Sequence, residues 1–175
     1  MLLNIDMGVL IIIAQKDFRD EEFFEPKEIL EKNGIEVKVA SKELAMAYGK
    51  MGGEFMPDLK LEDAKAEDFD AIIFVGGIGA EMYLDDLVAH RLANDFYGAG
   101  KIVAAICFAP LILAHAGILN GKKVTVWIGG KEDLEAYGAV YTGKPVEVDG
   151  NIITGSGPAV AKEFGEKIIE VLLKK

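Results

Sequence analysis

Uninterrupted apolar runs divide the chain into a series of buried strands. The run from Gly8 to Ala14 is rich in β-branched residues and contains no polar position. Such a run is typical of a strand that is covered on both faces, as in a parallel sheet. Comparable runs predict further strands at residues 35–40, 70–75, 101–106 and 124–128.

Segments with helical character lie between these strands. In the first of them Asp20 is placed to cap the helix, the glutamates that follow favour its positive end, and Gly34 ends it. Turns that contain glycine predict hairpins within residues 46–61 and 146–154. Further helices are predicted at residues 61–69, 81–97, 108–116, 132–137 and 158–173.

This alternation of strands and helices defines the fold class. It predicts an α/β protein, a three-layer αβα sandwich with a flavodoxin-like, mostly parallel sheet. In such a sheet the crossovers are right-handed, and ligands bind at the carboxyl ends of the strands. No linker, internal repeat or low-complexity segment interrupts the chain, so we predict a single domain over residues 1–175.

The net charge of the chain argues against one class of binding partner, nucleic acids. Lysine and arginine number 19 against 29 aspartates and glutamates, which gives a formal net charge of -10. With a pI near 4.7, the chain lacks the basic surface that grips a phosphate backbone, so we expect no nucleic-acid partner. Abundant lysine and glutamate beside a single glutamine resemble the composition of hyperthermophile proteins.

The hydropathy of the sequence indicates where in the cell the protein is expected. No apolar run approaches the roughly 18 to 20 residues that a membrane span requires, so we expect no membrane partner. The early run after Asp6 is short and lacks a basic leader, which does not fit a secretory signal. The expected location is the cytoplasm.

The single cysteine, Cys107, lies where a predicted strand turns directly into a predicted helix. A nucleophile on such an elbow needs small residues two positions away on each side, and Ala105 and Ala109 meet this need. The dipole and free amides of a helix start favour a thiolate, so we expect a lowered thiol pKa and a reactive sulfur. A buried structural cysteine is the alternative.

The sequence offers a carboxylate, rather than a histidine, as partner for this thiol. His115 lies eight residues after Cys107 on the predicted helix, and His90 falls within another helix. If the first strand neighbours the Cys107 strand, an acidic residue after it, such as Glu22, can reach the sulfur. Composition alone favours Glu22 as an exposed carboxylate at a helix start; a partly buried, protonated carboxyl that shuttles protons is the alternative.

Residues 76–79 are rich in glycine and offer backbone amides for an oxyanion hole. They match neither a P-loop nor the full dinucleotide fingerprint. One cysteine and two histidines fall short of a zinc site, and the acidic pairs of the chain lack the spacing of a cation-binding loop. We therefore expect neither a metal nor an organic cofactor.

Four segments together resemble the DJ-one/ThiJ/PfpI superfamily, which has a class I glutamine amidotransferase-like fold. They are residues 20–26, 75–77, 104–110 and 148–158, and the resemblance extends over nearly the whole chain. The resemblance implies that Cys107 is a nucleophilic, oxidation-prone cysteine and that Glu22 is the protonated carboxyl beside it. It also implies that Gly77 contributes an amide donor and that the protein forms dimers or larger rings.

The chain departs from this family at two positions. Members with claimed intracellular peptidase activity carry histidine directly after the cysteine, where this chain has Phe108. Glu81 matches the glutamate that those peptidases contribute across a subunit contact. In the DJ-one branch a histidine approaches from a later strand, and Trp127 stands at that place. What remains is a Cys-Glu pair, as in members with glyoxalase or deglycase activity.

Three functions follow as hypotheses. The first is a glyoxalase or deglycase in which Cys107 attacks a small reactive carbonyl, Glu22 moves protons, and amides near Gly77 and Phe108 hold the oxyanion. Its pocket would be walled by Phe108, Trp127 and Phe18. The second is a redox-responsive protein that senses oxidants through a Cys107 sulfinic acid. The third is a peptidase or amidase, which Phe108 disfavours.

Overall fold

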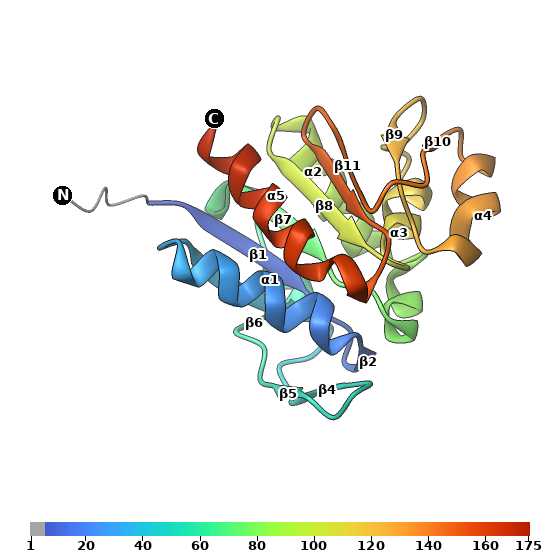
Figure 1. The fold of residues 1–175 in the computed structure, drawn as a ribbon. Helices are drawn as coiled ribbons and strands as arrows, with labels where there is room; N and C mark the ends of the chain where they lie inside the picture. The colour runs from blue at the N-terminus through green and yellow to red at the C-terminus, as the bar shows by residue number, and fades with distance from the viewer. Residues whose placement is uncertain (1–5) are drawn as a thin grey trace.

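A seven-stranded sheet forms the middle layer of the computed structural model, which describes residues 6–175 (Figure 1). From edge to edge its strands are β11 (Val146–Asp149), β12 (Ile152–Gly155), β8 (Ile102–Ile106), β7 (Ala71–Phe74), β1 (Gly8–Ile12), β3 (Glu36–Ser41) and β6 (Leu59–Lys60). Every neighbouring pair is parallel except the hairpin of β11 and β12. The carboxyl ends of the parallel strands therefore lie along the same side of the sheet, in a row that runs across the strands.

Helices cover both faces of this sheet (Figure 1). On one face α1 (Asp20–Lys32) packs along α5 (Ala161–Leu173), and on the other α2 (Leu87–Gly98) packs against β7, β8 and α3 (Pro110–His115). The small helix α4 (Lys131–Ala136) lies beside the two-stranded sheet of β9 (Lys123–Val124) and β10 (Val140–Tyr141). The three-layer α/β sandwich expected from the sequence is confirmed.

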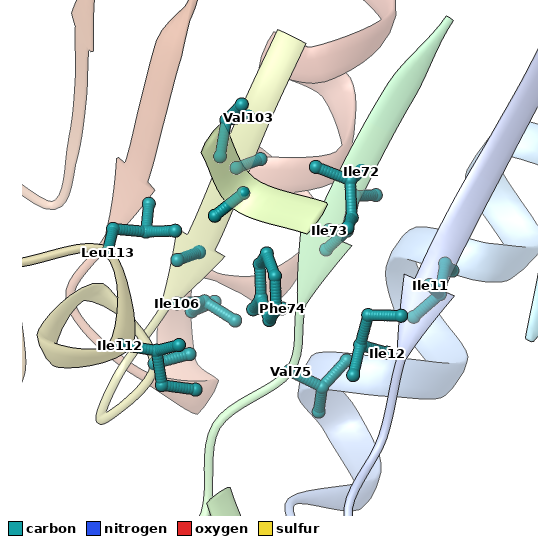
Figure 2. Packing of buried hydrophobic residues seen from close by; sticks show 14 of the residues in the cluster. Ile11, Ile12, Ile72, Ile73, Phe74, Val75, Val103, Ile106, Ile112 and Leu113 are labelled. Carbon is teal, nitrogen blue, oxygen red and sulfur yellow. The ribbon is translucent and has the colours of Figure 1, made fainter. Parts of the chain in front are cut away.

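The central strands supply the core, as their apolar runs predict. Val9, Leu10, Ile11 and Ile12 are at most 1% exposed, and every residue of β7 and β8 is buried. Figure 2 shows Phe74 of β7 between side chains of β8 and β1. Within residues 6–175, no helix combines the length and the apolar character needed to cross a bilayer.

Some local expectations are wrong. Asp20 does not cap α1; Arg19 takes that place, and the Asp20 carboxylate accepts the Met51 and Gly53 amides at 2.8 and 2.6 Å. Those amides belong to the predicted hairpin, which is confirmed as β4 (Ala47–Gly49) and β5 (Glu54–Phe55), with β2 (Lys16–Phe18) at its side. The Asp20 carboxylate therefore ties the start of α1 to this loop.

Two predicted elements are also shorter than expected. The strand predicted at residues 124–128 pairs only as β9, and the helix predicted at residues 61–69 is two 3₁₀ turns, η1 (Leu61–Asp63) and η2 (Ala66–Asp68). Likewise, the stretch at residues 81–97 divides into the 3₁₀ helix η3 (Ile78–Tyr83) and α2. The division falls where Asp86 caps α2 by accepting the Val88 and Ala89 amides, both at 2.9 Å.

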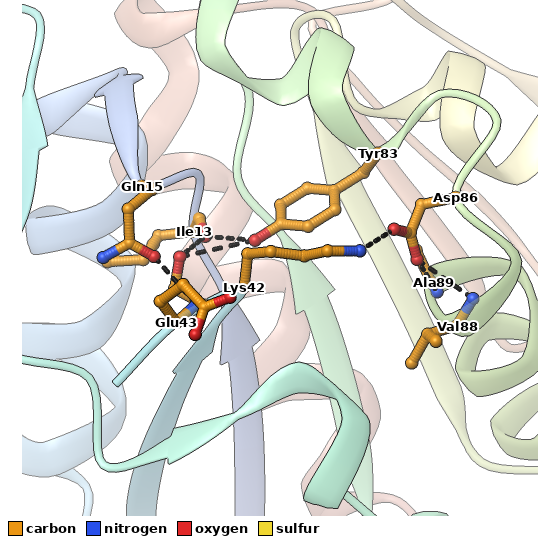
Figure 3. Close-up of polar contacts among 9 residues, drawn as sticks. Ile13, Gln15, Lys42, Glu43, Tyr83, Asp86, Val88 and Ala89 are labelled. Atoms are coloured by element: carbon orange, nitrogen blue, oxygen red, sulfur yellow. Dashed lines mark hydrogen bonds and ion pairs between the residues drawn. The ribbon is translucent and has the colours of Figure 1, made fainter. Parts of the chain in front are cut away.

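A buried polar network fastens η3 to the sheet edge (Figure 3). The Tyr83 hydroxyl donates to the Ile13 carbonyl at 2.8 Å, and the Ser41 hydroxyl donates to the same oxygen at 2.7 Å. Lys42 pairs with Asp86, the cap of α2. Burial raises the pKa of Tyr83 to about 12, so this phenol stays a donor. The network fixes the far end of the segment that begins at Gly77.

Candidate active site

The backbone at Cys107 is strained. Its φ is +63°, and among the described residues only Asp17 shares a positive φ without being glycine. The Cys107 amide donates to the Gly155 carbonyl, and the Cys107 carbonyl accepts the Trp127 amide, both at 2.9 Å. A left-handed non-glycine residue costs about 1 to 2 kcal/mol and persists only where its surroundings enforce it. The elbow predicted from the sequence is therefore present, with the sulfur turned out of the strand at its carboxyl end.

Glu22 lies directly beside this elbow. Its side chain is 0% exposed, and neither carboxyl oxygen has a partner that meets hydrogen-bond geometry. The Cys107 thiol and the Gly76 backbone lie close enough to lower the pKa of Glu22, but burial outweighs them and raises it to about 8. A buried carboxylate without donors costs several kcal/mol, so at neutral pH Glu22 carries a proton.

Gly76 is the residue that lets these two groups meet. A Cβ atom at this position would lie 2.5 Å from the Ile106 carbonyl oxygen, 2.7 Å from Glu22 Oε1 and 2.9 Å from Cys107 Cβ. No side chain fits there. The chain then continues through Gly77, at φ +91°, whose own Cβ would lie 2.6 Å from the Arg19 nitrogen.

The thiol itself does not have the lowered pKa that its place at a helix start predicts. Burial raises the pKa of Cys107 to about 12, and a negative charge on Glu22 contributes to the rise. The backbone amides of Gly77 and Phe108 act in the opposite direction. The contribution from Glu22 vanishes when Glu22 is protonated, so the two groups titrate as one pair.

The surroundings decide where a single shared proton resides. Two backbone amides face the sulfur, whereas the carboxyl oxygens lack well-aligned donors. These amides favour a thiolate, but the pKa of about 8 for Glu22 against about 12 for Cys107 means that the first proton to leave the pair comes from Glu22. A thiolate beside a protonated Glu22 is therefore the minor form of the singly protonated pair. This pair is the arrangement of a nucleophile with its proton carrier.

A cavity of about 250 Å³ opens above the sulfur. Its lining residues are Arg19, Gly77, Ile78, Cys107, Phe108, Trp127 and Pro158. Trp127 and Phe108 thus lie where the sequence places them, but Phe18 does not. The Phe18 ring is 0% exposed and packs edge-on against Phe23, because apolar aromatic surface is better buried there than left at a rim. The expected wall role of Phe18 is wrong.

Strand order brings the pair together differently from the expectation. β1 does not neighbour β8, since β7 lies between them. Glu22 still reaches Cys107 because α1 begins over the strand ends and the Arg19 amide donates to the Gly76 carbonyl at 3.1 Å.

Residues 7–171 match the family model described as the DJ-1/PfpI family. The chain belongs to the DJ-1/PfpI family. It is 41% identical to the uncharacterized protein MJ0967 of Methanocaldococcus jannaschii, over 95% of this chain and 82% of that protein. It is 34% identical to the deglycase PH1704 of Pyrococcus horikoshii, over 95% and 99% of the two chains. The crystal structure of a ThiJ/PfpI domain protein from Brachyspira murdochii, 36% identical, superimposes with a TM-score of 0.94 over 96% and 97% of the chains. The resemblance inferred from sequence is confirmed.

This DJ-1/PfpI protein keeps both of its histidines away from the cavity. His115 bonds Asp85 at 2.9 Å and stacks on Tyr137, while His90 contacts the Leu84 carbonyl at 2.7 Å. Both are packing residues, as expected. Glu81 lies exposed on η3 and does not line the cavity described above.

Three residues that line the DJ-1/PfpI site were not predicted as site residues from the sequence: Arg19, Ile78 and Pro158. Arg19 lines the cavity, and its guanidinium holds Glu21 through contacts of 2.7 and 3.2 Å. Its only signal in the sequence is its position three residues before Glu22, which is weak because a charged residue at a helix start is usually solvated. Arg19 is charged at all accessible pH values, so it places a fixed cation near the pair.

Two further features of residues 6–175 bear comparison with this site: the grouping of metal-ligating side chains and a second hollow. Within residues 6–175, no group of three or more His, Cys, Asp or Glu side chains gathers around one point. A hollow of about 450 Å³ lies elsewhere, between η1, η2 and α2. Charged side chains of both signs line it, and neither a cysteine nor a histidine is among its lining residues.

Proposed function

We propose that the protein is a cysteine-dependent glyoxalase or deglycase that acts on small reactive carbonyls such as methylglyoxal, glyoxal or their protein adducts. The observation that carries the proposal is the buried Glu22 carboxyl, held without a well-aligned partner against Cys107. A carboxyl of this kind both gives and takes protons near neutral pH. The relative named a deglycase, PH1704, supports the same class of reaction.

The first step uses the minor form of the pair, in which the one shared proton is on Glu22 and Cys107 is a thiolate. The Cys107 thiolate adds to the aldehyde carbon, and the C=O electrons move onto the oxygen. That oxygen takes the Glu22 proton, so a neutral hemithioacetal and a Glu22 carboxylate result. The amides of Gly77 and Phe108 face the sulfur and are placed to stabilise the charge as it develops.

The second step uses the carboxylate that the first one leaves. Glu22 removes the proton from the former aldehyde carbon, and the electrons form an enediolate. The hydroxyl proton on the former aldehyde oxygen moves to the neighbouring oxygen, and Glu22 returns its proton to the neighbouring carbon. The product is a thioester of a 2-hydroxy acid. Water then adds to the thioester and releases the acid, with the thiol restored. In total, methylglyoxal and water become lactate, and no electron leaves or enters the protein.

The test is conversion of methylglyoxal to lactate by the purified protein. Cys107→Ser and Glu22→Gln should each lower turnover at least about 100-fold, since each removes the nucleophile or the proton carrier. Glu28→Gln makes the same change on an exposed face of the same helix and should leave turnover unaltered. Turnover that survives Glu22→Gln would contradict the mechanism.

A redox role is the second candidate, and one observation favours it. The sulfur faces an open cavity with the Gly77 and Phe108 amides beside it, and these donors suit the oxygens of a sulfinic acid. Mass spectrometry after peroxide treatment distinguishes the two functions. Two oxygens added to Cys107, with no lactate formed from methylglyoxal by the untreated protein, would favour the redox role.

A further inference from the structure

The walls of the Cys107 cavity are apolar well beyond what methylglyoxal needs. Four lining side chains are apolar: Ile78, Phe108, Trp127 and Pro158. Ile78 is 66% exposed and Trp127 is 47% exposed, so much of this apolar surface faces water when the cavity is empty. Apolar surface held open in this way gains free energy when a ligand covers it.

Few polar groups line the cavity. The Cys107 sulfur has the backbone amides of Gly77 and Phe108 beside it. The sole charged lining side chain, Arg19, already holds Glu21 in a two-point contact, so it does not require an anionic ligand. A ligand with its carbonyl at the sulfur therefore points its remaining atoms at apolar walls.

The indole of Trp127 is fixed in position. A Cβ atom at Gly129 would lie 2.1 Å from the indole Cη2 atom, so the ring rests directly on the Gly129 backbone. The Trp127 amide donates to Cys107 at 2.9 Å, and the Trp127 carbonyl accepts the Gly130 amide at 2.8 Å. This wall is rigid and tied to the elbow itself.

The volume leaves room for a ligand larger than methylglyoxal. At about 30 Å³ for each non-hydrogen atom, as in liquid water, methylglyoxal fills little more than half of the cavity of about 250 Å³. A 2-oxoaldehyde longer by roughly three methylenes, such as 2-oxohexanal, fills it.

From these observations we infer that the preferred substrates are 2-oxoaldehydes with a linear apolar chain, up to about the length of 2-oxohexanal, held between Trp127, Phe108 and Ile78. The inference rests on the proposed function for its reaction and on the cavity alone for its selectivity. Each methylene that leaves water on binding favours the complex about two- to fourfold.

Two measurements test the inference. The first is kcat/KM for methylglyoxal, 2-oxobutanal, 2-oxopentanal and 2-oxohexanal, which should rise about two- to fourfold with each carbon. The second needs no turnover: the rate at which N-butyl iodoacetamide alkylates Cys107, divided by the rate with iodoacetamide. This ratio should exceed about 5, since the butyl chain occupies the apolar walls.

Variants locate the effect. Trp127→Ala should lower the alkylation ratio at least about threefold and flatten the chain-length series. Tyr48→Ala removes an aromatic ring of similar exposure on β4, outside the cavity, and should change neither. Since Trp127 is half exposed, the variant retains its core, and thermal unfolding checks this.

The outcomes separate this inference from the proposed function. An alkylation ratio above 5 that falls in Trp127→Ala, without turnover of any aldehyde, supports the apolar selectivity and overturns the enzymatic function. A ratio near 1 in the parent protein overturns the inference even if methylglyoxal is converted. A ratio that is high but identical in Trp127→Ala also overturns it, because the wall assigned here would then not bind the chain.

Discussion

Two buried polar groups lie near the same edge of the sheet, and their surroundings differ in one respect. The Tyr83 hydroxyl reaches the Ile13 carbonyl at 2.8 Å and has Ser41 beside it. Glu22 is equally buried, yet neither of its carboxyl oxygens has a well-aligned partner. A satisfied polar group stabilises the fold, whereas an unsatisfied one keeps its capacity to bind or transfer protons. The comparison indicates that Tyr83 stabilises the fold, whereas Glu22 is available to transfer protons.

The largest expected effect comes from filling the space between Glu22 and Cys107. Gly76→Ala would place a Cβ atom within 2.9 Å of three neighbours, two of them in the reactive pair. We expect at least about a 100-fold loss of turnover and a loss of about 1 to 3 kcal/mol of stability from overpacking. Gly98→Ala, with no atom near its added Cβ, is the control. Full turnover in Gly76→Ala would show that the close approach is unnecessary.

The next effect concerns what the unpartnered carboxyl costs the fold. The pKa of Glu22 is raised from 4.5 to about 8, so the folded state binds more protons than the unfolded state between these values. Stability from this group is therefore fully present below pH 4.5 and is lost as pH rises toward 8. Glu22→Gln has no such loss and should gain about 2 to 3 kcal/mol over the parent between pH 4 and pH 7.

Urea unfolding of both proteins at several pH values measures this gain. Taking the difference relative to pH 4 cancels the packing change of the substitution, because both side chains are then neutral. A pH-independent difference would mean that Glu22 is ionised in the folded state, and the contrast with Tyr83 would fail.

A third measurement locates the shared proton. The rate of Cys107 alkylation by iodoacetamide should still be rising with pH above 9, because burial and the Glu22 charge raise the pKa of this thiol. Glu22→Gln removes that charge, so the profile should move to lower pH. A move to higher pH would place the shared proton on Glu22 in the parent protein.

The smallest effect tests the satisfied group. Tyr83→Phe removes a donor from the Ile13 carbonyl, which keeps the Ser41 hydroxyl at 2.7 Å. We expect a loss of about 1 kcal/mol in urea unfolding and less than a twofold change in turnover. Phe96→Leu, at a buried site on α2 away from the network, serves as a matched core control. A loss of turnover larger than the loss of stability explains would give Tyr83 a role in the chemistry.

The sequence predicts the sheet and the elbow for a physical reason. Apolar runs such as residues 8–14 can be satisfied only between two layers, and the small residues around Cys107 allow one kind of turn. Glu22 is different, because a glutamate at a helix start is ordinarily solvated and its burial depends on Gly76, β7 and the elbow together. For the same reason the sequence does not predict the raised pKa of Cys107. The start of a helix indicates a dipole that favours the thiolate, but it does not indicate how far burial removes the sulfur from water.

Other residues show where local patterns are insufficient. The stretch at residues 124–128 predicts a strand, yet only Lys123 and Val124 pair, since the Trp127 amide donates to the Cys107 carbonyl instead. Phe18 and Phe108 are indistinguishable by type, and tertiary packing alone puts one in the core and the other in the cavity.

The position of β7 between β1 and β8 also has a consequence during folding of the chain. Glu22 follows the first strand and Cys107 follows the fifth strand of the sheet along the sequence, so loop closure over a long segment must precede their meeting. A nascent or partly folded chain carries an ordinary exposed thiol and an ordinary carboxylate. The reactive pair forms only once β1, β7 and β8 have all docked side by side. Reaction at Cys107 with the help of Glu22 therefore indicates that these three strands are in place.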